Sequence, residues 1–249
     1  ERMIYVVDNR QGTHFKQLFR TVEKTGIAGK ELDLEFSGFG TMNGKDGKPY
    51  KTREGGVMRL ETLLSDVNDV IYNKIMENRQ ESEENARATA KIVGLAAVKY
   101  GDLSNQTSKD YIFDTERFAS FEGNTGPYIL YTIVRIKSIL AKYEASGKNV
   151  SDCHCRMVSP KSDSEKDLML ALAKFNAVME NAYEETAPHK ICAYIYELAN
   201  AFNSFYHGTK ILAETDETLQ KSYVSTLELT KSVLETCIDV LGFSAPERM

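Results

Sequence analysis

The chain has 249 residues, of which 42% are hydrophobic and 27% charged, and a formal net charge of −5. This composition is ordinary for a soluble globular protein of one large or two medium domains, and no apolar run reaches the length of a membrane span. We therefore expect a cytoplasmic protein without membrane contact. The negative net charge argues against extensive coating of nucleic acid but is compatible with a local basic contact surface.

The four cysteines give no disulfide framework in a chain of this size. The motif Cys153-His154-Cys155 places potential ligands at i and i+2, with no second pair nearby, and this does not match the usual zinc spacing. We expect reduced thiols and no protein-bound metal. The remaining cysteines are Cys192 and Cys237.

The first elements follow the pattern of an α/β protein. Ile4–Asp8 is an apolar run typical of a buried parallel strand, Gln11–Lys24 has the pattern of an amphipathic helix, and Leu32–Phe39 alternates like a second strand. This order predicts a crossover unit, half of a doubly wound sheet, with ligands at residues 9–14 and 38–56 beside the carboxyl ends of the strands. The residues that we expect on the inner side of the helix are Phe15, Leu18, Phe19 and Val22.

The chain opens directly before its first core strand, which indicates a piece of a longer protein. Without neighbouring strands, Ile4–Asp8 would leave an unpaired hydrophobic edge. We therefore expect self-association, in the form of a dimer.

Gly40–Gly56 is the longest polar loop and contains five glycines and four cations. A cationic, glycine-rich loop after a strand end suits the neutralisation of a polyphosphate. A basic surface loop explains the same composition equally well, and the Walker pattern is absent because no Gly-Lys-Ser/Thr follows. The four cations are Lys45, Lys48, Lys51 and Arg53.

The middle and the end of the chain are predicted to be mainly helical. We expect helices at Val57–Arg79 and Ser82–Tyr100 and an extended segment at Asp110–Ser120. Beyond residue 126 the hydrophobic periodicity predicts helices only, with a polar connection at residues 146–164. The later helices are expected at Ser164–Glu185, from Pro188 onward, and at Glu217–Leu241.

The stretch Phe121–Ile136 joins the mixed part of the chain to the helical part. Its glycines and proline predict a tight turn and then a helix that runs to about Tyr143. On this helix Tyr128, Tyr131 and Arg135 share one face. Two rings beside a guanidinium suit an unpaired base and its phosphate. The spacing alone, however, favours a tyrosine-rich core face.

Six short motifs occur along the chain in one order and at compatible spacing. They are Ile4-Tyr5-Val6-Val7-Asp8-x-x-Gln11-x-x-His14-Phe15, Lys51-Thr52-Arg53-Glu54-Gly55, Ala96-Ala97-Val98-Lys99-Tyr100-Gly101-Asp102-Leu103, Gly123-Asn124-Thr125-Gly126-Pro127-Tyr128, Ala187-Pro188-His189 and Pro246-Glu247-Arg248-Met249. Together they resemble the carboxy-terminal half of an arginyl-tRNA synthetase, a class I aminoacyl-tRNA synthetase, over nearly the whole chain.

The resemblance implies a fold in three parts. Residues 1–60 would form the second half of a Rossmann-type nucleotide-binding sheet with its phosphate-stabilising loop. Residues 61–120 would form a helical connecting region, and residues 121–249 an all-α anticodon-binding domain.

The resemblance also implies roles for residues of the catalytic half. Gln11 matches a glutamine that helps to hold the substrate arginine, and His14 matches a residue near the ATP site. Lys51 and Arg53 lie where class I enzymes carry the lysine–methionine–serine–lysine signature, so they would stabilise the charge of the pyrophosphate. The second lysine of that signature is absent here, as in many arginyl enzymes.

In the helical half, the resemblance implies contacts with tRNA. Tyr128, Tyr131 and Arg135 match residues that contact the anticodon loop. Tyr206 and Met249 match residues that border the pocket for an anticodon-loop base.

The implied activity is ligation of arginine to its tRNA through arginyl-adenylate, with arginine, ATP with Mg²⁺ and arginine tRNA as substrates. The four histidines of the chain do not form the His-x-Gly-His signature that binds ATP in class I enzymes. We therefore expect the chain alone to read the anticodon without full catalysis. Two alternatives stay open: a non-catalytic helical module that binds tRNA or protein, and a related enzyme such as a cysteinyl-tRNA synthetase.

Overall fold

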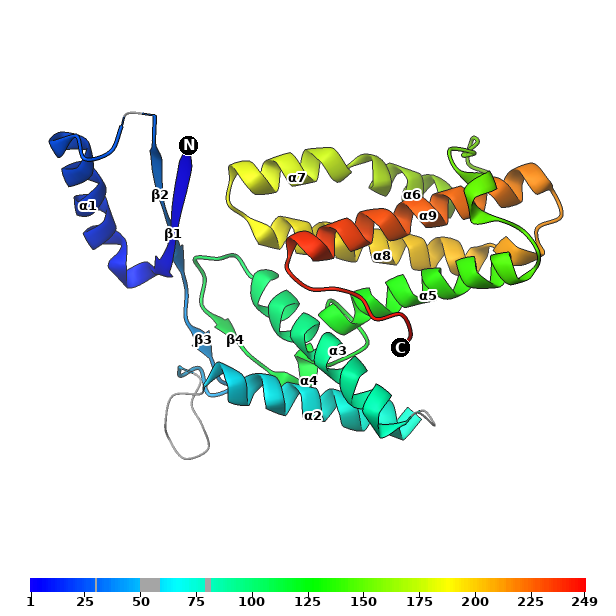
Figure 1. Ribbon diagram of the computed structural model, residues 1–249, viewed down its shortest axis with the longest axis horizontal. Coiled ribbons are helices and arrows are strands. Elements are labelled where there is room, and N and C mark those ends of the chain that lie inside the picture. Colours follow the sequence, from blue (N-terminus) through cyan, green and yellow to red (C-terminus); the bar gives the residue numbers. More distant parts are fainter. Residues whose placement is uncertain (30, 50–58, 79–81) are drawn as a thin grey trace.

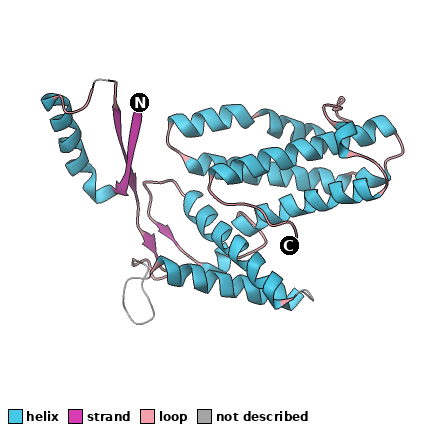
Figure 2. Ribbon diagram, viewed as in Figure 1, coloured by secondary structure: helices cyan, strands magenta, loops and turns pink. Residues whose placement is uncertain are grey.

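The computed structural model of the protein describes residues 1–29, 31–49, 59–78 and 82–249 (Figure 1). A small α/β unit lies at one end, a pair of long helices crosses below it in this view, and a helical bundle forms the rest. The strands gather on the side of the α/β unit, and the bundle contains helices and loops (Figure 2). The predicted fold class, a sheet remnant followed by an all-α bundle, is confirmed.

The predicted strand–helix–strand unit is present. Strand β1 (Arg2–Asp8) pairs in parallel with β2 (Asp33–Phe39), and the chain between them forms a short 3₁₀ turn, η1 (Asn9–Gln11), and helix α1 (Gly12–Thr25). Phe15 of α1 is buried against the sheet, with its ring 5.2 Å from that of Tyr5 and 5.7 Å from that of Phe36. These aromatic contacts hold α1 on the two strands.

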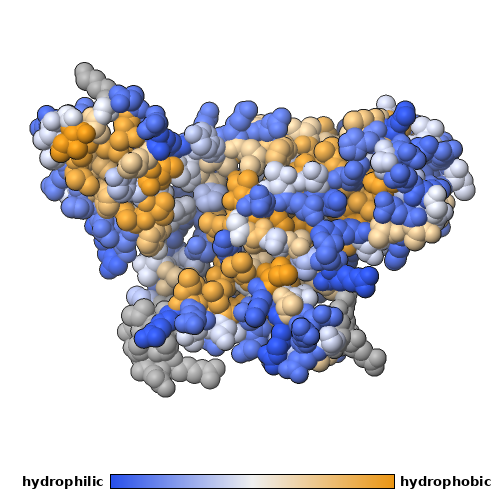
Figure 3. Space-filling view, in the orientation of Figure 1, coloured by the Kyte–Doolittle hydropathy of each residue, from blue (hydrophilic) through white to orange (hydrophobic). Residues whose placement is uncertain are grey.

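The two-stranded sheet leaves apolar side chains exposed. Met3 is 45% exposed, Val6 61% and Phe39 43%. Figure 3 shows the corresponding hydrophobic surface over the α/β unit. The prediction that Leu18 faces inward was wrong, because two strands are too narrow to cover this position of α1 and Leu18 is exposed. The unpaired apolar surface that the sequence predicted is present, while self-association stays a prediction.

A second, very short parallel pair joins β3 (Met42–Asn43) to β4 (Tyr111–Ile112), and the pairing of β3 was not predicted. The segment expected to be extended from 110 to 120 instead forms β4 and one helical turn, α4 (Thr115–Phe118). The turn begins where the Asp114 carboxylate accepts hydrogen bonds from the amides of residues 116 and 117.

The two helices expected in the middle of the chain are present as α2 (Leu60–Asn78) and α3 (Glu83–Leu103), and they pack against each other. Ser82 caps α3 by accepting a hydrogen bond from the Asn85 amide. Leu60, the first residue of α2, is 64% exposed. The fully or nearly buried apolar residues of α2 are Leu63, Val67, Ile71 and Ile75.

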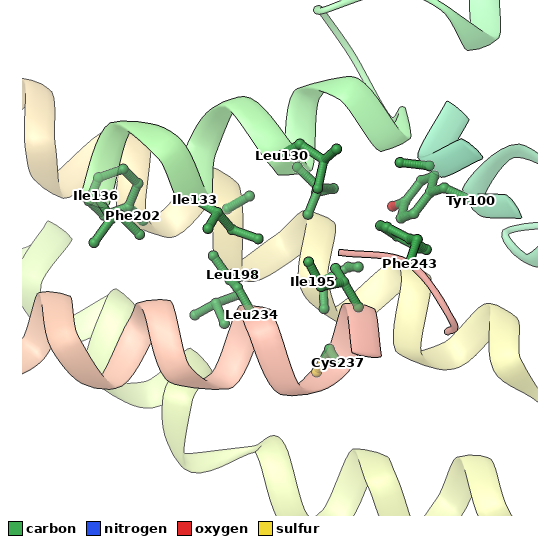
Figure 4. Packing of buried hydrophobic residues seen from close by; sticks show 14 of the residues in the cluster. Tyr100, Leu130, Ile133, Ile136, Ile195, Leu198, Phe202, Leu234, Cys237 and Phe243 are labelled. Atoms are coloured by element: carbon green, nitrogen blue, oxygen red, sulfur yellow. The ribbon is translucent and has the colours of Figure 1, made fainter. Parts of the chain in front are cut away.

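The bundle contains α5 (Gly126–Ala145), α6 (Asp163–Ala173), α7 (Phe175–Glu184), α8 (Pro188–Gly208) and α9 (Glu217–Val240), with the 3₁₀ turns η2 (Val150–Cys153) and η3 (Ile211–Ala213). Its core is formed by apolar side chains of α5, α8 and α9 that point toward one another (Figure 4). The labelled residues of these helices are Leu130, Ile133, Ile136, Ile195, Leu198, Phe202, Leu234 and Cys237.

The prediction of a single helix at 164–185 was wrong, because the chain forms two helices with a break at Lys174. There the Lys174 amide donates to the carbonyl of Ala171, three residues back, instead of four. The segment contains neither glycine nor proline, so local sequence does not mark the break. Lys174 forms an ion pair with Glu197 of α8 at 2.6 Å, and the Phe175 ring packs toward that of Tyr194 at 6.5 Å.

A polar junction of Arg2, Glu35 and Thr186 joins the sheet to the bundle. Arg2 donates to Glu35 Oε2 at 2.7 Å and to Thr186 Oγ1 at 2.7 Å, and the Thr186 hydroxyl donates to Glu35 Oε1 at 2.7 Å. Thr186 has a φ of 50°, which is strained for a β-branched residue, and these hydrogen bonds hold it there.

Within the described part of the chain, no helix is long and apolar enough to cross a membrane.

The start of α5 depends on close contact with α3. A Cβ added at Gly126 would lie 2.4 Å from the carbonyl oxygen of Ala96. We predict that Gly126→Ala lowers the free energy of unfolding by about 1–3 kcal/mol in urea denaturation, because α3 and α5 must separate. Gly208→Ala is the matched control, since its Cβ would meet only Ser164 Oγ at 3.7 Å. Equal effects of the two changes would contradict the close contact.

The junction also predicts a pH dependence. The hydrogen bonds from Thr186 and from Arg2 lower the pKa of Glu35. Because the folded-state pKa is depressed, the stabilisation is present above the unfolded-state pKa and is lost as pH falls through the folded-state value. We expect Glu35→Gln to reduce the loss of stability between about pH 5 and pH 3. An unchanged slope of unfolding free energy against pH would show that Glu35 contributes nothing.

Candidate nucleic-acid interface

Helix α5 begins at a defined point in the fold. The Thr125 hydroxyl accepts a hydrogen bond from the Tyr128 amide at 3.3 Å, and Pro127 occupies the first turn, as predicted. Thr125 in turn donates to the carbonyl of Ser120 at 2.6 Å. These contacts fix which side of α5 each later residue takes.

The face that carries Tyr128, Tyr131 and Arg135 is not part of the buried core. Tyr131 is 37% exposed, and Tyr128 and Arg135 are half-buried. The core side of α5 carries Leu130 and Ile133 instead, both fully buried. Of the two interpretations that the sequence left open for this face, the structure favours an accessible surface.

Helix α8 presents two asparagines to this face of α5. The Tyr128 hydroxyl donates to Asn200 Oδ1 at 2.7 Å and accepts from Asn203 Nδ2 at 2.8 Å. Asn203 Oδ1 accepts from Arg135 Nη1 at 2.7 Å. Burial raises the pKa of Tyr128, against the opposing effects of Asn203 and Arg135, so the phenol stays protonated and keeps its donor.

Arg135 lies between two aromatic rings. Its guanidinium carbon is 4.7 Å from the centroid of the Tyr131 ring and 5.5 Å from that of the Tyr206 ring. The Tyr206 ring is itself stacked on Phe202, with centroids 5.9 Å apart and an interplanar angle of 20°. Two rings and a planar cation, all partly accessible, offer stacking surfaces for a nucleobase and a donor for a phosphate.

These groups line a groove of about 830 Å³. Tyr131 and Arg135 come from α5, Tyr206 from α8, and Met249 from the tail that follows α9. The structure therefore brings together four of the five residues expected to contact tRNA, and Tyr128 lies behind them in the hydrogen-bond network.

The tail is held against α5. It turns back after α9 and runs toward α5 (Figure 1). Lys137 of α5 forms ion pairs with Glu247 at 2.9 Å and with Glu235 of α9 at 3.4 Å. Burial opposes the charge of Lys137, but the two carboxylates outweigh it and raise the pKa of the amine. Met249 packs against the core and lines the groove.

Gln11 and His14 lie in the other half of the molecule. Both are exposed, and Gln11, at the N-terminal cap position of α1, makes no side-chain hydrogen bond to the helix. The His14 and Phe15 rings meet edge to face, with their centroids 5.4 Å apart. Lys51 and Arg53, the two cations expected to stabilise pyrophosphate, lie outside the described residues.

A cavity of about 490 Å³ lies at the carboxyl end of β2, where a ligand was expected. Phe39, Gly40 and Met42 line it together with Leu103 of α3 and Pro188 of α8. Its walls are mostly apolar, and among the described residues that line it neither Gln11 nor His14 occurs.

The side chains of the Cys153-His154-Cys155 motif diverge. Cys153 is buried, with its sulfur 3.3 Å from the Tyr143 hydroxyl, while His154 Nδ1 is 3.1 Å from Glu228 Oε2. Cys155 is exposed. In the described ranges no three His, Cys, Asp or Glu side chains are grouped as metal ligands would be.

Two protein families match the sequence. The family "tRNA synthetases class I (R), catalytic domain" matches residues 1–115, and the "DALR anticodon binding domain" matches residues 129–249. Arginine–tRNA ligases of Agathobacter rectalis and Alkaliphilus oremlandii are 64% and 55% identical to the chain over its whole length. The chain belongs to the arginyl-tRNA synthetase family. It spans 43% and 42% of the length of these two curated relatives.

Solved arginyl-tRNA synthetases have the same fold. The enzyme from Plasmodium falciparum aligns with a TM-score of 0.84 at 28% identity, over 100% of this chain and 41% of the solved chain. The Thermus thermophilus enzyme aligns with a TM-score of 0.81 at 25% identity, over 99% of this chain and 41% of the solved one. The family resemblance read from the sequence is confirmed, in preference to a cysteinyl enzyme.

Asn200, Asn203 and Lys137 were not predicted from the sequence. A signal was available for the asparagines, since residues 196, 200, 203 and 206 are spaced to share one face of α8, with the two asparagines between two tyrosines. No local signal pointed to Lys137, whose partners lie 98 and 110 positions further along the chain.

The ion pairs of Lys137 generate a test of how the tail is held. We predict that Lys137→Met increases amide hydrogen exchange in residues 244–249, because the tail loses its charged anchor on α5. Lys142→Met is the matched control, since Lys142 lines the same groove and the ion pairs found among the described residues do not include it. Unchanged exchange in Lys137→Met would mean that apolar packing alone holds the tail.

Proposed function

We propose that the groove between α5, α8 and the tail binds the anticodon loop of arginine tRNA. The observation that carries this proposal is the convergence of Tyr131, Arg135, Tyr206 and Met249 from three distant parts of the chain on one groove. Bases of a tRNA loop are unstacked and can insert between aromatic side chains. Membership of the arginyl-tRNA synthetase family and the match to an anticodon-binding domain support the same proposal.

The chemistry of the groove suits recognition of an extruded base. The Tyr131 and Tyr206 rings offer flat apolar faces, and Met249 offers a flexible apolar contact at the groove wall. The Arg135 guanidinium can donate to the edge of a base or to a phosphate. Each stacked base contributes roughly 1–3 kcal/mol in comparable sites.

We further propose that the whole protein ligates arginine to its tRNA. The arginine carboxylate attacks the α-phosphorus of Mg-ATP, the bond to the bridging oxygen breaks, and pyrophosphate leaves. A hydroxyl of the 3′-terminal ribose then attacks the carbonyl of arginyl-adenylate, and AMP leaves. Such steps need positioning and charge stabilisation more than covalent chemistry from side chains.

In this reaction we assign Gln11 to the substrate arginine and His14 to the region of the nucleotide. Lys51 and Arg53 would neutralise the pyrophosphate as it separates. The assignments rest on the family motifs and on the location of these residues within residues 1–60, which we propose as part of the catalytic domain. We propose residues 61–120 as the connecting region and 121–249 as the anticodon-binding domain.

A filter-binding titration at one fixed, modest salt concentration tests the anticodon proposal. The full 249-residue chain is titrated with arginine tRNA and with the same tRNA carrying a changed middle or third anticodon base. We expect weaker binding to the changed tRNA. Equal binding to both would indicate contact with phosphates only. No binding to either would favour the alternative, a helical module that binds another protein.

Variants of the groove sharpen this test. We predict that Tyr131→Ala weakens binding of arginine tRNA by about 5- to 150-fold, the loss expected for one stacking interaction. Tyr131→Phe is the matched control, because it keeps the ring and should bind nearly as the unchanged chain does. Arg135→Ala should also weaken binding. If Tyr131→Ala folds and binds with unchanged affinity, Tyr131 is not in the interface.

A further inference from the structure

Asn203 occupies a distinctive position behind the groove. It lies on α8, half-buried, one turn before Tyr206 and one turn after Asn200. Within the described part of the chain it is not among the residues that line the groove. It nevertheless contacts Tyr128 and Arg135, two of the α5 residues assigned to tRNA.

The hydrogen bonds of Asn203 fix the direction of its amide. A guanidinium has donors only, so the amide oxygen must face Arg135 and the amide nitrogen must face Tyr128. The Tyr128 hydroxyl then accepts a hydrogen bond from Asn203 and donates one to Asn200 Oδ1. No other orientation of the Asn203 amide satisfies both neighbours.

The same contact determines where the Arg135 guanidinium lies. A free arginine side chain has many rotamers, and ordering one of them carries an entropic cost. Here the bond to Asn203, at 2.7 Å, adds direction to the cation–π contacts with Tyr131 and Tyr206. The guanidinium is thereby held between the two rings before any ligand arrives.

We propose that Asn203 is a positioning residue for anticodon recognition, which holds the Arg135 guanidinium between Tyr131 and Tyr206 and orients the Tyr128 hydroxyl. The proposal rests on the proposed function of the groove. Asn203 acts through Arg135 and Tyr128 and does not touch the tRNA. It differs from a residue that merely joins α5 to α8, because its loss should change selectivity and the mobility of one side chain while the fold persists.

The first experiment measures Arg135 without any RNA. Nitrogen-15 NMR of the arginine side chains in the full chain should show slow rotation of the Arg135 guanidinium. The signal is assigned to Arg135 because it is missing from the spectrum of Arg135→Lys. Asn203→Leu, of similar shape, should abolish the slow rotation. Asn203→Asp keeps an acceptor for Arg135 and should restore it. Asn200→Ala removes an acceptor from Tyr128 only and should leave it unchanged. Slow rotation that persists in Asn203→Leu would overturn the proposal.

The second experiment measures binding of arginine tRNA and of the tRNA with a changed anticodon base. Asn203→Leu should bind the cognate tRNA about tenfold more weakly, as expected for loss of a hydrogen bond to a charged group. It should bind the changed tRNA as before. In an Arg135→Ala background the further loss from Asn203→Leu should be less than twofold, because the group that it positions is gone.

The outcomes separate the two proposals. If the unchanged chain does not discriminate between the tRNAs, the function of the groove is wrong, and the NMR result still decides whether Asn203 positions Arg135. If the unchanged chain discriminates but Asn203→Leu weakens the binding of both tRNAs by the same factor, Asn203 serves only the packing of α5 on α8. Full additivity with Arg135→Ala would show direct contact of Asn203 with RNA, which also contradicts a positioning role.

Discussion

The bundle and its groove both depend on α5, which packs against α3, α8 and α9. One side of α5 buries Leu130, Ile133 and Ile136 completely, and its other side carries Tyr128 and the groove residues. A helix has enough faces to do both, since residues three and four apart share a side. The apolar contact supplies stability, and the polar contact beside it supplies the geometry of a binding surface.

Behind the groove, polar side chains of α5 and α8 hydrogen-bond to one another. Tyr128, Asn200, Asn203 and Arg135 form a continuous set of hydrogen bonds at 2.7–2.8 Å. A buried polar group without a partner would destabilise the fold, so such a set specifies one arrangement of its members. Preorganised donors and rings lose less conformational entropy when a ligand binds, which is why a fixed guanidinium suits recognition better than a mobile one.

The α/β unit has a different character. Its aromatic cluster is small, and apolar residues such as Val6 and Phe39 are exposed on it. Its connection to the bundle includes the junction of Arg2, Glu35 and Thr186, where three side chains from β1, β2 and the α7–α8 turn share hydrogen bonds. The strained backbone of Thr186 is maintained there because the surrounding contacts determine it.

The sequence by itself determined the fold class, the family, the long helices and the face of α5 that carries Tyr128, Tyr131 and Arg135, because periodicity, caps and ordered motifs are local properties of a chain. Only the tertiary structure decided that this face is accessible, that Tyr206 and Met249 meet it, and that Asn203 and Lys137 hold the pieces together. It also decided the break at Lys174 and the pairing of β3 with β4. These features depend on contacts between residues far apart in sequence, and such contacts leave no local pattern.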